Sequence, residues 1–193
     1  MKHQPIALAL MLAFFALAPA VIYPVFLMKA LCFALFACAF NLLIGYVGLL
    51  SFGHALFFGW AAYISAHLAE VGTVSLPYWA GGWAWLVIPL PPLSPEFAIL
   101  GGMLFAACLG LIVGSLAIRR QGIYFAMITL ALAQMMYFFA IQAPFTHGED
   151  GIQAVPRGRL FGFIDLADQT NMYVTVLVIF LGCFLLIYRI VNS

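Results

Sequence analysis

The sequence predicts an all-α, polytopic membrane protein of about six transmembrane helices, with one glycine-rich element that breaks a helix or forms a loop. Two observations carry this prediction. Of the 193 residues 67% are hydrophobic and only 7% are charged, whereas a soluble domain carries about 25% charged residues. The uncharged runs are also long enough to cross a bilayer as helices, which need about 20 apolar residues each. We therefore expect one transmembrane domain over residues 1–193.

Runs without acidic or basic residues locate the expected helices. The six expected spans cover residues 6–24, 26–45, 54–70, 97–118, 122–142 and 171–189. The first span has a second interpretation, because Lys2, an apolar run and Ala16–Ala18 are also typical of a cleavable signal peptide. Since apolar residues continue through Val21 and Ile22, we favour an uncleaved span.

Residues 71–96 are uncharged over most of their length but are not expected to cross the membrane. Their prolines would interrupt a helix, because proline lacks the backbone N–H. Trp79, Trp83 and Trp85 cluster within this segment, and indole rings prefer the headgroup level. The segment is therefore predicted to be an interfacial lid or a partial re-entry on the extracytoplasmic side.

Arg119 and Arg120 form a basic pair in a very short loop between two expected spans. The positive-inside rule places this pair, and Arg189 after the last span, in the cytoplasm. The loop 144–170 then lies outside. The side of the N-terminus depends on whether residues 45–53 cross the membrane or turn back, and the sequence leaves both open.

Small residues recur every four positions along the span 97–118, on one helical face. They are Ala98, Gly102, Ala106, Gly110 and Gly114. Such a face allows two helix backbones to approach closely. We interpret it as a packing surface in preference to a ligand site.

Residues 41–63 contain four glycines within a long apolar block. Each glycine costs roughly 1 kcal/mol relative to alanine inside a helix, so the cluster predicts close packing or a helix broken beside a solute path. The candidate path residues here are Gly45, Gly48, Ser51, Gly53 and His54. The alternatives are a short glycine-capped loop and, for the histidine, a neutral hydrogen-bonded side chain.

Two polar residues of the span 122–142 join the candidate path, Thr129 and Gln134. A threonine in a helix can instead bond its own preceding carbonyl. A glutamine amide in hydrocarbon needs a partner, which is more often another helix than a solute.

An outer loop with turn residues and acids follows the same span. Its motif residues are Thr146, Gly148, Glu149, Asp150 and Gly151. They predict a structured outer loop, with a solvated loop as the alternative. Their spacing is not that of an EF-hand, so no metal site is expected.

The sequence lacks the motifs of common enzymes. It has no G-x-x-x-x-G-K-S/T motif, no G-x-S-x-G and no H-E-x-x-H. We therefore expect no ATP-hydrolysing P-loop, no catalytic residue and no enzymatic activity.

Three blocks in order along the chain resemble motifs of one protein family. Residues 41–55 match N-L-x-x-G-y-x-G-x-x-S-x-G-H-a, residues 117–130 match R-x-R/Q-G-x-Y-x-A-x-x-T-L, and residues 146–151 match T-G-G-x-D/N-G. Together they resemble bacterial branched-chain amino acid ABC importer permeases of the LivM-like branch. His147 departs from the usual glycine, and Gln134 stands where many members have glutamate.

The resemblance implies a non-enzymatic transport subunit of the bacterial inner membrane. Such a permease pairs with a second, homologous permease chain, two cytoplasmic ATPase subunits and a periplasmic solute-binding protein. It needs no cofactor of its own, because the ATPase subunits use the ATP. Related permeases carry urea or short amides, so the solute stays open.

Family members extend beyond the position that matches Ser193 by several more spans of ~20 residues each. We therefore expect a partial sequence, without the C-terminal spans and the cytoplasmic segment that couples to the ATPase. An alternative function is a truncated membrane remnant that does not transport. A third possible function is a passive channel for small solutes.

Overall fold

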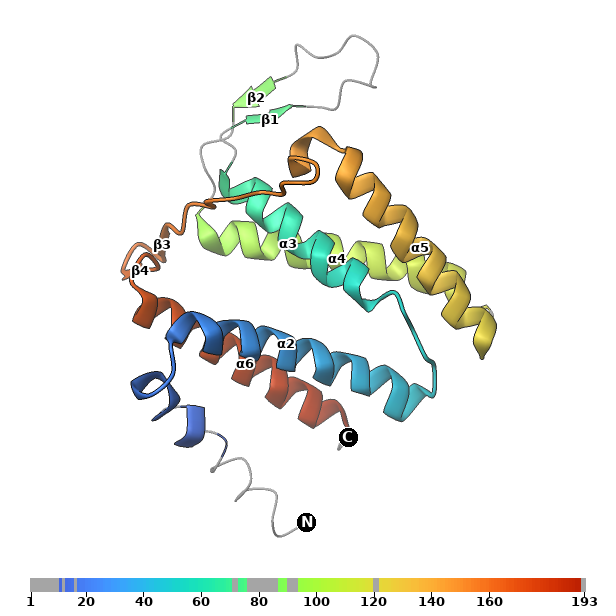
Figure 1. Cartoon of the computed structure of the whole chain (residues 1–193), viewed down its shortest axis with the longest axis horizontal. Helices are drawn as coiled ribbons and strands as arrows, with labels where there is room; N and C mark the ends of the chain where they lie inside the picture. The colour runs from blue at the N-terminus through green and yellow to red at the C-terminus, as the bar shows by residue number, and fades with distance from the viewer. Residues whose placement is uncertain are drawn as a thin grey trace. The chain divides into compact units, whose positions relative to one another are not determined.

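The computed structural model describes residues 11, 13–15, 17–70, 73–75, 87–89, 94–119 and 122–191. These residues are mainly helical (Figure 1). The long helices are α2 (Pro24–Leu42), α3 (His54–Glu70), α4 (Pro95–Ala117), α5 (Ile123–Gln142) and α6 (Gln169–Val191). Among the described residues, four helical stretches are long and apolar enough to cross a membrane: Pro24–Val47, α4, α5 and α6. The predicted all-α polytopic membrane fold is confirmed.

The chain divides into two compact units. The terminal unit comprises Met1–Tyr46 and Leu166–Ser193, and the central unit comprises Val47–Asp165.

In the terminal unit α2 and α6 pack along each other. Their buried contact consists of Leu27, Met28 and Leu31 from α2 and Tyr173 and Phe180 from α6. Leu27 and Met28 lie four and three positions before Leu31, and Tyr173 lies seven before Phe180. These spacings place the buried residues on one side of each helix. The rest of each helix surface is largely exposed and apolar, as expected for helices in lipid.

The first predicted span ends earlier than expected. A short 3-10 helix, η1 (Ala18–Ala20), precedes a turn, and Tyr23 is extended (φ −58°, ψ 125°) before α2 begins at Pro24. The predicted end at residue 24 is therefore wrong. Proline has no N–H to continue a helix and restricts the residue before it to extended conformations, so Pro24 starts a helix in place of ending one. Residues 6–10, 12 and 16 of this span lie outside the described residues.

In the central unit α4 runs antiparallel to α3, while α5 runs in the same direction as α3. Gly102 and Gly110 of α4 face Ala61 and Phe57 of α3 respectively, so the sequence numbers run in opposite directions. Trp60 lies in the centre of this unit and is only 4% exposed. Its ring centroid is 5.9 Å from that of Phe105, 5.5 Å from that of Phe139 and 6.1 Å from that of Phe145.

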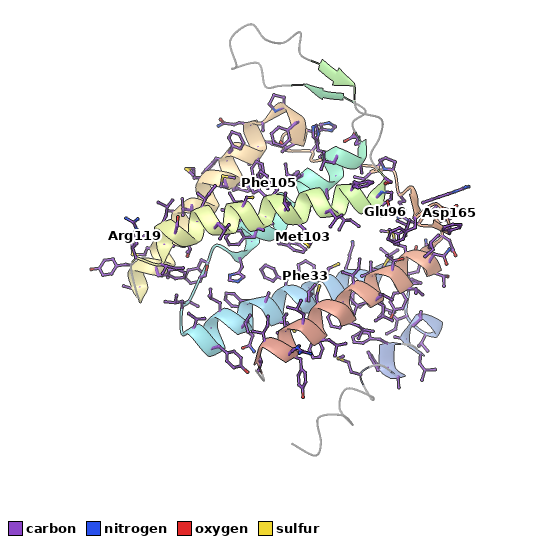
Figure 2. All side chains as sticks on the ribbon, turned by 180° about the vertical axis from the view of Figure 1, so that it is seen from behind. Phe33, Glu96, Met103, Phe105, Arg119 and Asp165 are labelled. Carbon is purple, nitrogen blue, oxygen red and sulfur yellow. The ribbon has the colours of Figure 1, made fainter. Side chains whose placement is uncertain are left out.

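The two ends of α4 carry opposite charges. Figure 2 shows Glu96 at one end of this helix and Arg119 at the other. Asp165, at the end of the central unit, lies on the Glu96 side.

Two short hairpins lie in the connections. Strand β1 (Thr73–Ser75) pairs antiparallel with β2 (Val87–Pro89), and Val74 stands opposite Ile88. These strands and residues 94–96, where α4 begins, are the described part of the predicted lid, whose tryptophans lie outside the described residues. Strand β3 (Arg159–Leu160) pairs antiparallel with β4 (Ile164–Asp165).

Candidate functional site

The predicted helix break is present between α2 and α3. After α2 the chain makes one π-helical turn, η2 (Leu43–Val47), and residues 48–53 then have no regular secondary structure until α3 begins at His54. Gly48 has a φ of +72°, a left-handed conformation that glycine adopts without steric cost. The glycine-rich composition therefore ends one helix and permits the turn before the next.

A threonine hydroxyl of α5 holds the end of this break. The backbone N–H of Phe52 donates a 3.2 Å hydrogen bond to Oγ1 of Thr129, which itself donates a 3.0 Å bond to the carbonyl of Ala126. Thr129 is 2% exposed. The back-bond expected from sequence is present, and the same oxygen also accepts from a backbone group 77 residues away.

Ser51 satisfies the next backbone group of the break. The N–H of Gly53 donates a 3.2 Å hydrogen bond to the Ser51 hydroxyl, and Ser51 is 4% exposed. The carbonyl of Gly53 accepts from the N–H of Leu56 at 3.1 Å and so begins the turn into α3. Side-chain hydroxyls thus replace the helical partners that the broken backbone has lost.

Gly53 permits the close contact with α5. A Cβ atom placed on Gly53 would lie 3.2 Å from both Cβ and the carbonyl oxygen of Thr129. The carbonyl belongs to the helix backbone and cannot move without bending α5. A side chain at position 53 would therefore push the break away from Thr129 and lengthen the bond to Phe52.

The irregular segment 48–53 contacts α5 more than one helical turn beyond the first residue of that helix. Thr129 lies six residues beyond Ile123, the first residue of α5, which corresponds to about 9 Å along the helix axis. Because α5 is long and apolar enough to span a membrane, this depth reaches the hydrocarbon region. Irregular backbone is tolerated there only where protein covers it or water contacts it.

The structure brings only part of the predicted path together. Gly53 contacts both Ser51 and Thr129, as described above. His54 begins α3, with its ring edge-on to that of Phe57 at 6.4 Å between centroids. Gly48 and Gln134 are both exposed, and Gln134 lies on the same helix as Thr129 without joining this contact.

Gly45 belongs to the terminal unit. A Cβ at this position would lie 3.6 Å from Oδ1 of Asn41, one helical turn earlier. Its contact is therefore with its own helix.

The small-residue stripe of α4 contacts α3 along part of its length. Ala98 is 3% exposed, and a Cβ on Gly102 would lie 2.6 Å from the carbonyl oxygen of Ala61. Ala106 is half-buried, and a Cβ on Gly110 would lie 3.9 Å from the Phe57 ring. At Gly114 the nearest described atom belongs to Ile118, the residue that caps the same helix. The stripe is thus closest to α3 at Gly102.

The outer loop begins as a cap on the C-terminus of α5. Thr146 is fully buried, and its hydroxyl is shared between the carbonyls of Ala140 and Ala143, the latter at 2.7 Å. These carbonyls lie at the helix end, where the helix itself supplies few N–H partners, and that of Ala143 also accepts from the backbone N–H of Thr146 at 3.3 Å.

The remaining motif residues form turns beyond this cap. Gly148 and Gly151 have φ values of +65° and +66°, and Glu149 and Asp150 are exposed. His147 also has a positive φ, of 61°. Within the described part of the chain, no group of three or more His, Cys, Asp or Glu side chains could hold a metal ion.

Two residues that organise the helices were not singled out from the sequence. Trp60 is the aromatic centre of the central unit, yet a tryptophan in an apolar run is equally compatible with the membrane interface. Tyr173 is 2% exposed, and its hydroxyl bonds a backbone carbonyl of a segment 158 residues away. Their apolar neighbours in sequence carry no signal of either role.

Comparison with known proteins gives one family. Residues 22–193 match the family model described as branched-chain amino acid transport system / permease component. No curated protein and no solved structure matches the chain. The family match spans both compact units and includes the break, Thr129 and the outer loop.

Proposed function

This chain belongs to the family of branched-chain amino acid transport permease components, and on that premise we propose that it forms the membrane path of an ABC importer for branched-chain amino acids. It works beside a second, homologous permease chain in the bacterial inner membrane. A periplasmic binding protein delivers the solute, and two cytoplasmic ATPase subunits drive alternating access. The family and the membrane-spanning helices support this proposal.

The observation that carries the path proposal is the break held on Thr129. One side of the break is buried, through Ser51 and Gly53, whereas Gly48, Leu50 and Phe52 are exposed. Exposed irregular backbone is unfavourable against lipid, because each unpaired polar group costs several kcal/mol there. The exposed side of this break is therefore suited to a water-filled or solute-filled path.

The chemistry of the exposed side suits an amino acid with an aliphatic side chain. Backbone amides and carbonyls around Gly48 can bond an ammonium or carboxylate group, as broken helices do in other transporters. Leu50 and Phe52, 46% and 53% exposed, add apolar surface beside these polar groups. A urea-sized or short amide solute would use the polar groups but would not need the apolar ones.

Labelled leucine uptake by cells that carry the complete transport system tests the path. The variant Gly53→Leu should lose most of its uptake, because the side chain meets the α5 backbone at Thr129. Gly59→Leu is the matched control, since no heavy atom lies within 4 Å of a Cβ at Gly59. Membrane abundance of both variants is measured alongside. Normal leucine uptake by a normally abundant Gly53→Leu variant would contradict a path at the break.

Competition separates the two solute classes. Unlabelled isoleucine and valine should reduce leucine uptake in proportion to their concentration, whereas urea and acetamide should leave it unchanged. Uptake of labelled urea by this system, with no competition from leucine, would instead identify it as a permease for short amides.

A further inference from the structure

The hairpin β3–β4 has an unusual turn. Arg159 pairs with Asp165 and Leu160 pairs with Ile164, which leaves Phe161, Gly162 and Phe163 as the turn. The N–H of Phe163 donates a 3.1 Å hydrogen bond to the carbonyl of Leu160. Phe161 has a φ of 51° and Gly162 a φ of 76°. Left-handed conformations suit glycine but are unfavourable for a bulky residue, so the hairpin holds an aromatic side chain in a strained position.

The two aromatic side chains of this turn are largely exposed. Phe163 is 93% exposed and Phe161 is 72% exposed, and the neighbouring Ile164 is 41% exposed. Turns in contact with water usually consist of glycine, proline, asparagine, aspartate and serine. An exposed apolar tip on a strained hairpin indicates a surface that contacts something other than water.

The hairpin is attached to the first turn of α4. The N–H of Phe161 donates to the carboxylate of Glu96, and a Cβ placed on Gly158 would lie 2.9 Å from Cγ of Pro95. Pro95 is the first residue of a helix long and apolar enough to cross the membrane. Figure 2 shows Glu96 and Asp165, the last hairpin residue, at the same end of α4. The hairpin therefore lies at the level where this helix leaves the hydrocarbon.

Distance along the chain keeps the tip at that level. Phe163 follows Phe161 by two residues, which span at most about 7 Å. The headgroup layer on each side of a bilayer is itself about 5–8 Å thick, from a total of 40–45 Å around a core of ~30 Å. Because the Phe161 N–H is bonded to Glu96, the Phe163 ring cannot extend far beyond this layer.

The charges next to the turn fit a phospholipid surface. Arg157 and Arg159 precede the turn, and both are exposed. Long basic side chains can reach phosphate groups while their aliphatic stems lie along apolar surface. Aromatic rings flanked by basic side chains form the combination found where proteins meet the headgroup region.

We propose that the aromatic turn, Phe161–Phe163, is a membrane anchor that inserts into the headgroup layer at the Glu96 end of α4. The rings of Phe161 and Phe163 contact the upper acyl chains, and Arg157 and Arg159 face the lipid phosphates. This anchor holds the extramembrane loop after α5 against the bilayer. A docked protein would also cover the rings, but the attachment to the end of a spanning helix favours lipid.

Photo-crosslinking tests the anchor independently of the transported solute. The analogue p-benzoylphenylalanine keeps the phenyl ring of Phe163 and adds a photoreactive benzoyl group, which a side chain 93% exposed can carry, and it reacts with whatever contacts that group. The control places it at Gln153, an exposed residue of the same loop whose side chain bonds the Asp150 carbonyl. Cells that carry the complete transport system are irradiated, and the purified chain is weighed by mass spectrometry. Both labelled chains must first purify with the unfolding temperature of the wild type.

The expected result is a mass increase of one phospholipid at position 163, at least several-fold more abundant than at position 153. A second measurement uses the purified chain in vesicles of phosphatidylethanolamine and phosphatidylglycerol, where the same lipid adduct should form without any partner. An adduct with another protein at position 163, or a yield of lipid adduct no higher than at position 153, would overturn the anchor.

Discussion

The hydroxyl of Tyr173 on α6 donates a 2.6 Å hydrogen bond to the backbone carbonyl of Phe15. In an α-helix that carbonyl would accept from the N–H four residues later, which is Pro19 and has no N–H. The carbonyl of Phe15 therefore has no partner within its own helix at that position. Tyr173 supplies one from a helix distant in sequence, and the ring of Phe15 also packs edge-on against Phe180 at 5.8 Å.

Removing the Tyr173 hydroxyl should destabilise the terminal unit. In Tyr173→Phe the carbonyl of Phe15 loses its partner, which should lower the free energy of unfolding by about 1–3 kcal/mol. Thermal unfolding of the chain in lipid nanodiscs measures this. Tyr124→Phe, at a tyrosine 66% exposed, is the control and should have little effect.

A second substitution separates the hydrogen bond from general packing. Pro19→Ala restores an N–H that can bond the carbonyl of Phe15. The loss caused by Tyr173→Phe should then be smaller in the Pro19→Ala background than in the wild type. Equal losses in the two backgrounds would show that the hydroxyl acts through something other than this carbonyl.

Thr129→Val should loosen the break from α5. Valine keeps the shape of threonine but leaves the Phe52 N–H without its acceptor, at a cost of about 1 kcal/mol. Hydrogen exchange at the Phe52 amide should accelerate roughly fivefold for that cost.

Thr175→Val provides the matched control for this experiment. The Thr175 hydroxyl donates a 2.8 Å hydrogen bond to the Asn171 carbonyl of its own helix. Its removal should leave exchange at Phe52 unchanged. If both substitutions or neither altered that exchange, the bond between Thr129 and Phe52 would not be what holds the break.

Gly102→Val should disrupt the packing of α4 against α3. The new Cβ would lie 2.6 Å from the Ala61 carbonyl oxygen, and because backbone cannot yield easily, overpacking should cost about 1–3 kcal/mol. Gly114→Val makes the same change in the same helix, where the nearest described atom is 3.9 Å away. The thermal unfolding midpoint should fall clearly for Gly102→Val and little for Gly114→Val. Equal decreases would indicate that only helix propensity matters.

His147→Gly should stabilise the outer loop slightly. His147 has a φ of 61°, a left-handed conformation that costs a residue with a Cβ atom ~1–2 kcal/mol. Glycine avoids this cost, which exceeds the ~0.5–1 kcal/mol of conformational entropy that glycine loses on folding. Thermal unfolding should therefore show a gain of a few tenths of a kcal/mol or more. The positive φ at position 147 also explains why the T-G-G-x-D/N-G motif, which residues 146–151 resemble, has glycine at this position.

Glu149→Gly is the control that shows whether a glycine in this loop raises or lowers the stability when the backbone φ is not positive. Glu149 is not among the residues with positive φ, so glycine brings only its entropic cost and should lower stability by ~0.5–1 kcal/mol. A loss of stability from His147→Gly as well would show that the histidine side chain contributes more than its backbone conformation costs.

The sequence alone determined which stretches are helical and that a break separates two of them. The predicted spans 54–70, 97–118 and 122–142 agree with α3, α4 and α5 to within two residues at each end. These features depend on local composition, because a run of uncharged apolar residues partitions into lipid as a helix whatever surrounds it. The first span ends before its predicted residue 24 because prolines 19 and 24 cannot donate helical hydrogen bonds, although the run stays apolar through Ile22.

Only the tertiary structure decided which polar group meets which backbone atom. Thr129 bonds Phe52 across 77 residues, and Tyr173 bonds Phe15 across 158 residues. Each pairing depends on how far one helix is rotated and shifted against its neighbour, which side-chain packing over the whole contact sets. An apolar helix presents nearly the same composition on every face, so its sequence does not say which side meets the next helix.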